Sequence, residues 1–197
     1  LKHDDYEVIK DLGNTYQAVG DINNAKKYYQ KALTINSNYA PALSNLGSME
    51  FNMGNKNEAI SLLIKATESD PDLEAAWGNL ANCYVFLGKL KEAETICFRL
   101  ININPNLFNY HFLLASILIR QKKLKEAELS LNKTIEIKPN FSHAHLNLGA
   151  ILKDLGKTKE AKISTLKAIE LNPNLFSAHF LLASILIEEE KLQEAEQ

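Results

Sequence analysis

Residues 74–107 read EAAWGNLANCYVFLGKLKEAETICFRLININPNL, and this stretch of 34 residues decides the fold. Near its end stands Pro105, and Pro71, Pro139 and Pro173 continue the same series at a spacing of 34 residues. A fixed period of this length is typical of a repeat architecture, in which one structural unit stacks on the next. The chain is therefore predicted to be an array of similar units.

Other positions keep the same period when the proline is placed at position 32 of a 34-residue unit. Position 8 holds only glycine or alanine, and position 15 holds glycine in four units. Position 7 is always leucine: Leu12, Leu46, Leu80, Leu114, Leu148 and Leu182. Position 20 is always alanine: Ala25, Ala59, Ala93, Ala127, Ala161 and Ala195. The predicted units are residues 6–39, 40–73, 74–107, 108–141, 142–175 and a truncated 176–197, in a single array over 1–197.

Each unit is predicted to form two helices. Trp77, Leu80, Ala81 and Tyr84 follow the i, i+3, i+4, i+7 spacing of one apolar stripe along a first helix. The glycine at position 15 can take the left-handed conformation that ends this helix, and the proline at position 32 ends the second one. The small residue at position 8 is expected to face the alanine at position 20, so that the two backbones approach closely.

This pattern is similar to the tetratricopeptide repeat, and the resemblance covers essentially the whole chain. In the stretch quoted above it is carried by Trp77, Leu80, Ala81, Tyr84, Ala93 and Pro105. The resemblance implies an all-α fold, a right-handed α-solenoid (superhelix) of tandem helix-turn-helix units. It also implies a concave groove, lined by the first helices, that binds a peptide or protein partner.

Composition excludes several other classes of partner. The formal net charge is -2 and charged residues are 23% of the chain, so neither nucleic acid nor an anionic membrane surface is expected. No apolar run approaches the roughly 18 residues needed to span a bilayer.

Cys83 and Cys97 are expected to be buried and unpaired, which favours a reducing compartment and hence the cytoplasm.

The predicted groove carries a row of asparagines. On each first helix, positions 2, 6, 9 and 13 point away from the apolar stripe. Asparagine stands at positions 6 or 9 in Asn14, Asn45, Asn79, Asn82 and Asn147. An amide offers a donor and an acceptor, the pair needed to hold a peptide backbone. The row resembles that of the repeats of O-linked N-acetylglucosamine transferase, although asparagine is also simply common here, at 20 of 197 residues.

Positions 5 and 12 lie beside this row and add larger side chains. Phe51, Phe112 and Ile119 would present partly exposed apolar surface, as would Phe180 and Ile187. Such surface marks a binding or self-association site. The alternative is that neighbouring helices cover these side chains.

Lys10 is the basic residue predicted in the groove. Lys10, Asn14 and Asn45 match three of the five positions of the carboxylate clamp in chaperone-binding tetratricopeptide domains. Ala75 and Asn79 stand at the two positions where that clamp has further basic residues. Because a free carboxylate needs that positive charge, a clamp is disfavoured.

His111, His145 and His179 all occupy position 4. Equivalent positions in packed helices lie about 8–10 Å apart or more, too far to share one metal ion. The imidazoles are instead expected to replace the signature tryptophan at a contact between units. We find no phosphate-binding loop or nucleophile elbow, and we predict no cofactor, no metal and no catalytic residue.

The sequence thus favours a non-enzymatic interaction scaffold. Two alternatives stay open. Both ends look cut from a longer array, so the chain could be the substrate-recruiting segment of a larger enzyme. It could also assemble into a homo-oligomer through its terminal repeats. Residues 104–119, NPNLFNYHFLLASILI, recur at 172–187 as NPNLFSAHFLLASILI, which indicates a duplicated pair of units.

Overall fold

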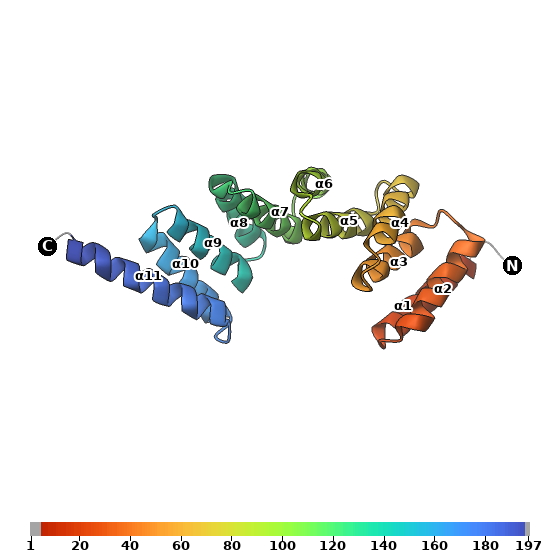
Figure 1. The fold of residues 1–197 in the computed structure, drawn as a ribbon, viewed down its shortest axis with the longest axis horizontal. Coiled ribbons are helices and arrows are strands. Elements are labelled where there is room, and N and C mark those ends of the chain that lie inside the picture. The colour runs from red at the N-terminus through yellow and green to blue at the C-terminus, as the bar shows by residue number, and fades with distance from the viewer. Residues whose placement is uncertain (1–4, 196–197) are drawn as a thin grey trace. The chain divides into compact units, whose positions relative to one another are not determined.

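The computed structural model describes residues 5–195, and within this range the chain is all helical, without a strand. The helices follow one another in hairpins (Figure 1). They are α1 (Asp5–Ala18), α2 (Ile22–Ile35), α3 (Ala40–Asn52), α4 (Lys56–Ser69), α5 (Glu74–Phe86), α6 (Leu90–Ile103), α7 (Phe108–Arg120), α8 (Leu124–Ile137), α9 (Ser142–Asp154), α10 (Thr158–Leu171) and α11 (Phe176–Ala195).

Tight turns join the two helices of a hairpin, as the glycine series predicts. Gly20, Gly54, Gly88 and Gly156 all have positive φ, between 74° and 90°. After α3, the Gly54 N–H donates to Phe51 O (3.0 Å) and the Asn55 N–H to Glu50 O (2.9 Å), which satisfies carbonyls at the helix end. Lys122, at the same position, takes a φ of 59°, so the turn survives there without glycine.

The paired helices approach closely where position 8 meets the second helix. A methyl group added to Gly47 would lie 2.8 Å from Leu63 Cγ and 3.2 Å from the carbonyl oxygen of Ala59. At Gly149 it would lie 2.4 Å from Thr165 Oγ1. The predicted need for a small residue at position 8 is confirmed at these two contacts.

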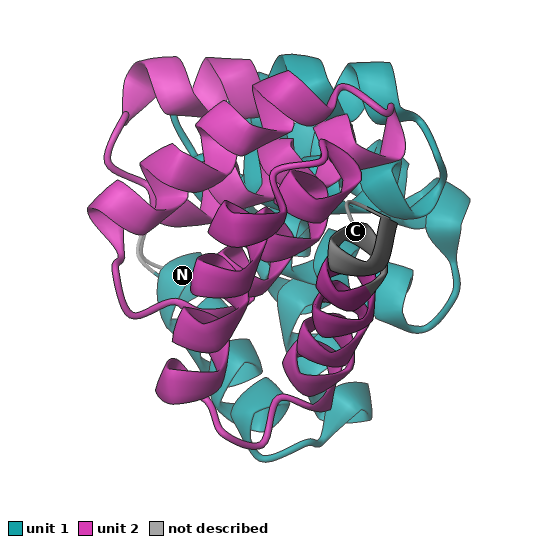
Figure 2. Cartoon of the chain, turned by 90° about the vertical axis from the view of Figure 1, so that its left-hand side faces the viewer, with its two compact units in different colours: residues 1–96 teal, residues 97–197 magenta. Residues whose placement is uncertain are grey.

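The chain divides into two compact units, residues 1–96 and 97–197 (Figure 2). In the first, Ala25, Tyr29, Leu46 and Met49 form one buried cluster. In the second, α7 packs on α8 and α9 packs on α10. Each unit therefore has a core built from the inward faces of its own helical hairpins.

The last predicted unit, 176–197, departs from the others. α11 continues to Ala195 and runs straight through Glu190, which stands at position 15 where other units turn. Glutamate favours a helix interior and takes a positive φ at a cost, so nothing local ends the helix there. The side chain of Ala195, predicted to face a position-8 residue, lies outside the described side chains.

Candidate functional site

The predicted groove residues lie on first helices of the hairpins. In the first unit they are Lys10 and Asn14 on α1, Asn45 and Phe51 on α3, and Asn79 and Asn82 on α5. In the second unit they are Phe112 and Ile119 on α7 and Asn147 on α9. Asn82 is exposed, and the other eight are half-buried.

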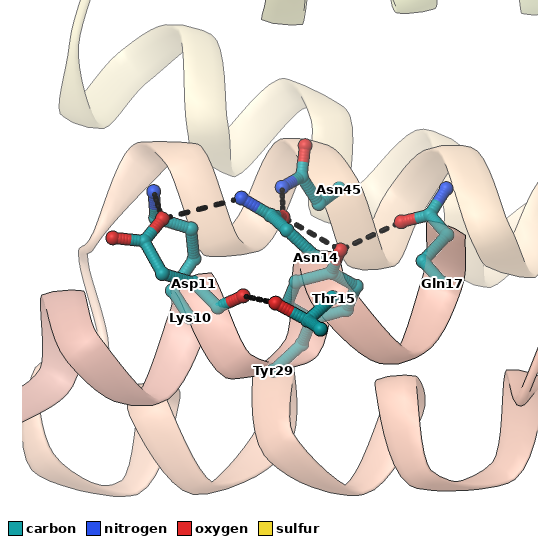
Figure 3. A network of polar contacts seen from close by, with 7 residues as sticks. All are labelled: Lys10, Asp11, Asn14, Thr15, Gln17, Tyr29 and Asn45. Atoms are coloured by element: carbon teal, nitrogen blue, oxygen red, sulfur yellow. Dashed lines mark hydrogen bonds and ion pairs between the residues drawn. The ribbon is translucent and has the colours of Figure 1, made fainter. Parts of the chain in front are cut away.

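A polar network ties α1 to α3 in the first unit (Figure 3). Asn45 donates from Nδ2 to Asn14 Oδ1 at 2.8 Å. The hydroxyl of Tyr29 lies 2.8 Å from the same oxygen and 2.6 Å from Gln17 Oε1. Because a hydroxyl has one proton, it donates to one of these oxygens at a time. Burial raises the pKa of Tyr29, so this hydroxyl keeps its proton at neutral pH.

The next asparagine in the row continues the same kind of contact. Asn79 on α5 donates from Nδ2 to Ser44 Oγ on α3 at 3.2 Å. Successive first helices of this unit are thus joined through asparagine side chains. The predicted row is partly a structural link between helices, a role that the spacing alone does not reveal. Tyr29, Gln17 and Ser44 belong to it although the sequence analysis does not include them.

Lys10 pairs with a carboxylate of its own helix. Its Nζ forms an ion pair with Asp11 Oδ1, and this hydrogen bond raises the pKa of Lys10. Asn14 Nδ2 lies 3.3 Å from the same Asp11 oxygen (Figure 3). The positive charge next to Asn14 and Asn45 is therefore neutralised locally, which agrees with the expectation against a carboxylate clamp.

The apolar side chains beside the row are covered to different extents. Phe51 packs edge-on against Phe86, and Phe112 packs edge-on against Phe141, with ring centroids 5.2 and 4.9 Å apart. Ile119 is half-buried. Phe180 and Ile187, at the equivalent positions of α11, are exposed. The first three are thus partly covered by neighbours, and the last two are open surface.

In the four units from residue 74 onward, position 4 carries a ring N–H that bonds the carbonyl of the preceding proline. Trp77 Nε1 donates to Pro71 O at 3.0 Å. The Nε2 atoms of His111 and His145 lie 2.9 and 2.8 Å from the carbonyls of Pro105 and Pro139. Histidine replaces tryptophan here because both rings supply a donor. Among the described residues, no group of three possible ligands could hold a metal ion.

Glu50 is a buried carboxylate that the sequence analysis does not single out. It stands at position 11 of the apolar stripe and is fully buried. Lys26 on α2 forms an ion pair with Oε1, and Asn55 donates to Oε2 at 2.7 Å. Burial raises the pKa of this carboxyl, but the bonds from Lys26 and Asn55 outweigh that effect, so its pKa is lowered overall. The charge is thus held between α2, α3 and the following turn.

Both cysteines are buried and neither is in a disulfide bond, as predicted. Burial raises the pKa of the Cys83 thiol to about 11. A thiol with such a pKa is protonated at neutral pH and is a poor nucleophile.

Hairpins of this period, with small residues at positions 8 and 20 and, from Trp77 onward, a ring donor at position 4, define a tetratricopeptide repeat protein. The family model of the Cilia and flagella-associated protein 70 C-terminal domain matches residues 3–197, and the chain belongs to that family. Among curated protein sequences, none matches the chain.

Solved structures with this fold include three similar chains. YrrB, described as a TPR protein with an unusual peptide-binding site, is 23% identical with a TM-score of 0.73, over 87% of this chain and 89% of its own. MamA from Desulfovibrio magneticus RS-1 is 16% identical with a TM-score of 0.78, over 89% and 99%. A tetratricopeptide repeat protein from Parabacteroides merdae ATCC 43184 is 20% identical with a TM-score of 0.79, over 97% and 76%.

These likenesses establish the fold class as an all-α helical repeat solenoid. Tetratricopeptide repeats form protein–protein interaction scaffolds, and the fold is consistent with that role here. In the part of the chain that the structure describes, no helix is both long and apolar enough to cross a bilayer.

Proposed function

We propose that this chain binds an extended segment of a protein partner along the first helices of its repeats, in the groove carrying Asn45, Asn79 and Asn82. The observation that carries the proposal is the direction of the asparagine bonds. Asn45 and Asn79 each use an amide N–H to join a neighbouring helix, which orients the side chain. The carbonyl oxygen of each amide can then accept from a peptide N–H.

Two further features support a peptide ligand. Asn82 lies one helical turn after Asn79 on α5 and is exposed, so its donor and acceptor both face water. Half-buried Phe51, beside the row, can receive an apolar side chain. YrrB, a chain of similar fold, is described as having an unusual peptide-binding site, which supports a peptide as the class of ligand.

Selection from a phage library of random 12-residue peptides tests the proposal directly. The affinity of a selected peptide is then measured for the variant Asn79→Ala/Asn82→Ala. We expect affinity to fall by about tenfold or more, since each lost bond contributes about 0.5–1.5 kcal/mol. The matched control is Asn23→Ala/Asn132→Ala, which removes exposed asparagines of the second helices α2 and α8. An unchanged affinity for the groove variant would reject the assigned roles.

We further propose that residues 1–197 bind without catalysing a reaction. The thiol of Cys83 is buried and protonated, so it does not serve as a nucleophile. The position-4 imidazoles of His111, His145 and His179 are each engaged with a proline carbonyl. An activity screen against hydrolase and transferase substrates tests this statement, and a turnover that purification does not remove would overturn it.

We place the protein in the cytoplasm, with a protein rather than a nucleic acid as its partner. Two buried cysteines outside any disulfide bond suit a reducing compartment, and a net charge of -2 provides no electrostatic attraction for phosphate backbones. Imaging of the tagged protein tests the location. Titration with a fluorescent double-stranded DNA at low salt tests the partner class, and saturable binding there would contradict it.

A further inference from the structure

Exposed apolar side chains lie on the second helices of the second unit, whereas the proposed groove lies on first helices. Leu129 on α8 is 70% exposed, and Ile163 and Leu166 on α10 are 68% and 47% exposed. Leu129 and Ile163 both stand at position 22 of the repeat, where α2 and α4 carry the polar residues Lys27 and Ser61. The fold therefore does not require an apolar residue at this position.

These apolar side chains belong to two stripes with charged ends. Each stripe begins with a lysine at position 18, ends with a glutamate at position 29 and follows the i, i+4, i+7, i+11 spacing of one helix face. The stripes consist of Lys125, Leu129, Asn132 and Glu136 on α8, and of Lys159, Ile163, Leu166 and Glu170 on α10. All eight residues are exposed. We call the two stripes together the outer face.

An ion pair and helix packing place the two stripes next to each other. Lys157 Nζ, at the residue before α10, lies 2.8 and 2.9 Å from the carboxylate oxygens of Glu128, which adjoins Leu129 on α8. Both α8 and α10 also pack on α9. α8 and the start of α10 are therefore neighbours, and the two stripes belong to one surface of the second unit.

The charges of the outer face oppose the helix dipole. Lys125 and Lys159 lie in the first turn of their helices, and Glu136 and Glu170 lie in the last turn. A helix has a positive partial charge at its N-terminus and a negative one at its C-terminus, so this placement is unfavourable within one chain. A neighbouring helix that runs in the opposite direction would offset this cost.

The two glutamates keep room for a second cation. Lys133 and Lys167 form ion pairs with Glu136 and Glu170 at 2.8 and 2.7 Å, on the same helices. The glutamate side chains nevertheless stay 69% and 67% exposed. Each carboxylate can therefore accept a further ammonium group from outside the chain.

An antiparallel copy of the outer face is complementary to it. When each helix pairs with its antiparallel copy in this register, position 18 lies opposite position 29, and position 22 lies opposite position 25. On α10, Lys159 then meets Glu170 of the second copy, and Ile163 meets Leu166 of the second copy. The stripe of α8 pairs its end charges in the same way. Because both helices share one register, a single two-fold axis produces both pairings.

We propose that the outer face binds a second copy of this chain, with α8 and α10 each lying antiparallel to the same helix of the copy. The occupant is a second copy because the face itself supplies both halves of the contact, a cation for an anion and an apolar side chain for an apolar side chain. The antiparallel arrangement also places the lysines of one copy at the negative helix ends of the other. The contact uses only second helices and so does not depend on the proposed groove.

Sedimentation equilibrium of the full chain tests the proposal. Loading concentrations from about 5 to 500 μM cover the micromolar affinities expected of a small contact, and we expect a reversible monomer–dimer equilibrium. Leu129→Ser/Ile163→Ser introduces the residue that α4 has at position 22. It should raise the dissociation constant by about tenfold or more, because it removes apolar surface from the contact in both copies. Both sites are exposed, so circular dichroism should show an unchanged helix content.

Charge reversal tests the antiparallel register. Lys159→Glu places two glutamates opposite each other at both symmetry-related contacts and should raise the dissociation constant about threefold or more at low salt. Glu170→Lys should weaken the dimer similarly, by opposing two lysines. The double variant Lys159→Glu/Glu170→Lys exchanges the two charges and should restore the affinity of the parent. A parallel pairing would oppose like charges in both the parent and the double variant, so the rescue is specific to the antiparallel arrangement.

A matched control and three outcomes make the test decisive. Phe180→Ser removes an exposed apolar side chain from the first helix α11 and should leave the dissociation constant unchanged. A monomer at every concentration would overturn the proposal. So would a dimer that Leu129→Ser/Ile163→Ser leaves intact, including one that Phe180→Ser dissociates, because the contact would then lie elsewhere. A double charge variant as weak as Lys159→Glu alone would also overturn it.

The proposed peptide-binding function is tested separately. Leu129 and Ile163 lie on second helices, outside the groove, so Leu129→Ser/Ile163→Ser should bind a selected peptide as the parent does. An intact dimer that binds no peptide would count against the groove alone, and a monomer that binds peptide would count against the dimer alone.

Discussion

Asn45 on α3 donates a 2.8 Å hydrogen bond to Asn14 on α1, 31 residues earlier in the sequence. The acceptor, Asn14 Oδ1, also lies 2.8 Å from the hydroxyl of buried Tyr29 on α2. One amide oxygen therefore connects three helices. The same side chains that are proposed to face a ligand also hold successive hairpins together.

This dual role predicts measurable coupling between the two asparagines. Asn14→Ala and Asn45→Ala should each lower the free energy of unfolding, and a double-mutant cycle should give a coupling of about 0.5–1.5 kcal/mol. Urea denaturation followed by circular dichroism measures it. The control is Asn82→Ala, because Asn82 is exposed. This substitution should change the free energy of unfolding by no more than about 0.5 kcal/mol. Additive effects of the two substitutions would mean that the bond does not form in solution.

Ala127 provides the test of close helix packing. It is fully buried on α8, in the hairpin whose position 8 is Ala115. Ala127→Leu should cost about 1–3 kcal/mol of stability because the added atoms force the helices apart. Leu129→Ala, two residues away at an exposed site, is the matched control for the helix. A denaturation midpoint for Ala127→Leu equal to that of the parent would refute the packing.

The hairpins could be predicted from the sequence because their requirements are local. Glycine at position 15 supplies the positive φ of the turn, and Lys122 shows that the repeat imposes this conformation even on a lysine. At Glu190 the same rule fails. There α11 continues to Ala195, and glutamate keeps the helical conformation that it favours.

The site was less predictable because its contacts depend on distances between helices. The repeat spacing places Asn14 and Asn45 on corresponding faces of two helices. It does not reveal that the two amides form a hydrogen bond. Glu50 is similar. A carboxylate in an apolar stripe indicates a partner, yet Lys26 lies on a helix of the preceding hairpin and no local pattern links them.

The ring donor at position 4 can be tested at His145. Its Nε2 lies 2.8 Å from the carbonyl oxygen of Pro139 and the side chain is half-buried. His145→Phe keeps the ring but removes the donor and should cost about 0.5–1.5 kcal/mol. His145→Trp restores a ring N–H, as Trp77 has it, and should recover most of that loss in thermal denaturation. If the two variants were equally stable, the hydrogen bond would contribute nothing.

Glu50 predicts a pH dependence of stability with a definite sign. Its pKa is lowered in the folded chain by Lys26 and Asn55, which overcome the opposing effect of burial. Such a carboxyl stabilises the fold above the unfolded pKa, about 4.3 for glutamate, and the contribution is lost as the pH falls through the lower folded value. Lys26→Met removes the cation and should cost about 1–3 kcal/mol at pH 7.

The difference between Lys26→Met and the parent should therefore narrow as the pH falls below about 4, because Glu50 then becomes neutral in both proteins. Urea unfolding at a series of pH values from 7 to 2.5 measures this difference. Lys27→Met, at the exposed neighbouring position of α2, controls for the loss of one positive charge. A difference that stays constant over this pH range would mean that Lys26 stabilises the fold through its alkyl chain and not through its bond to Glu50.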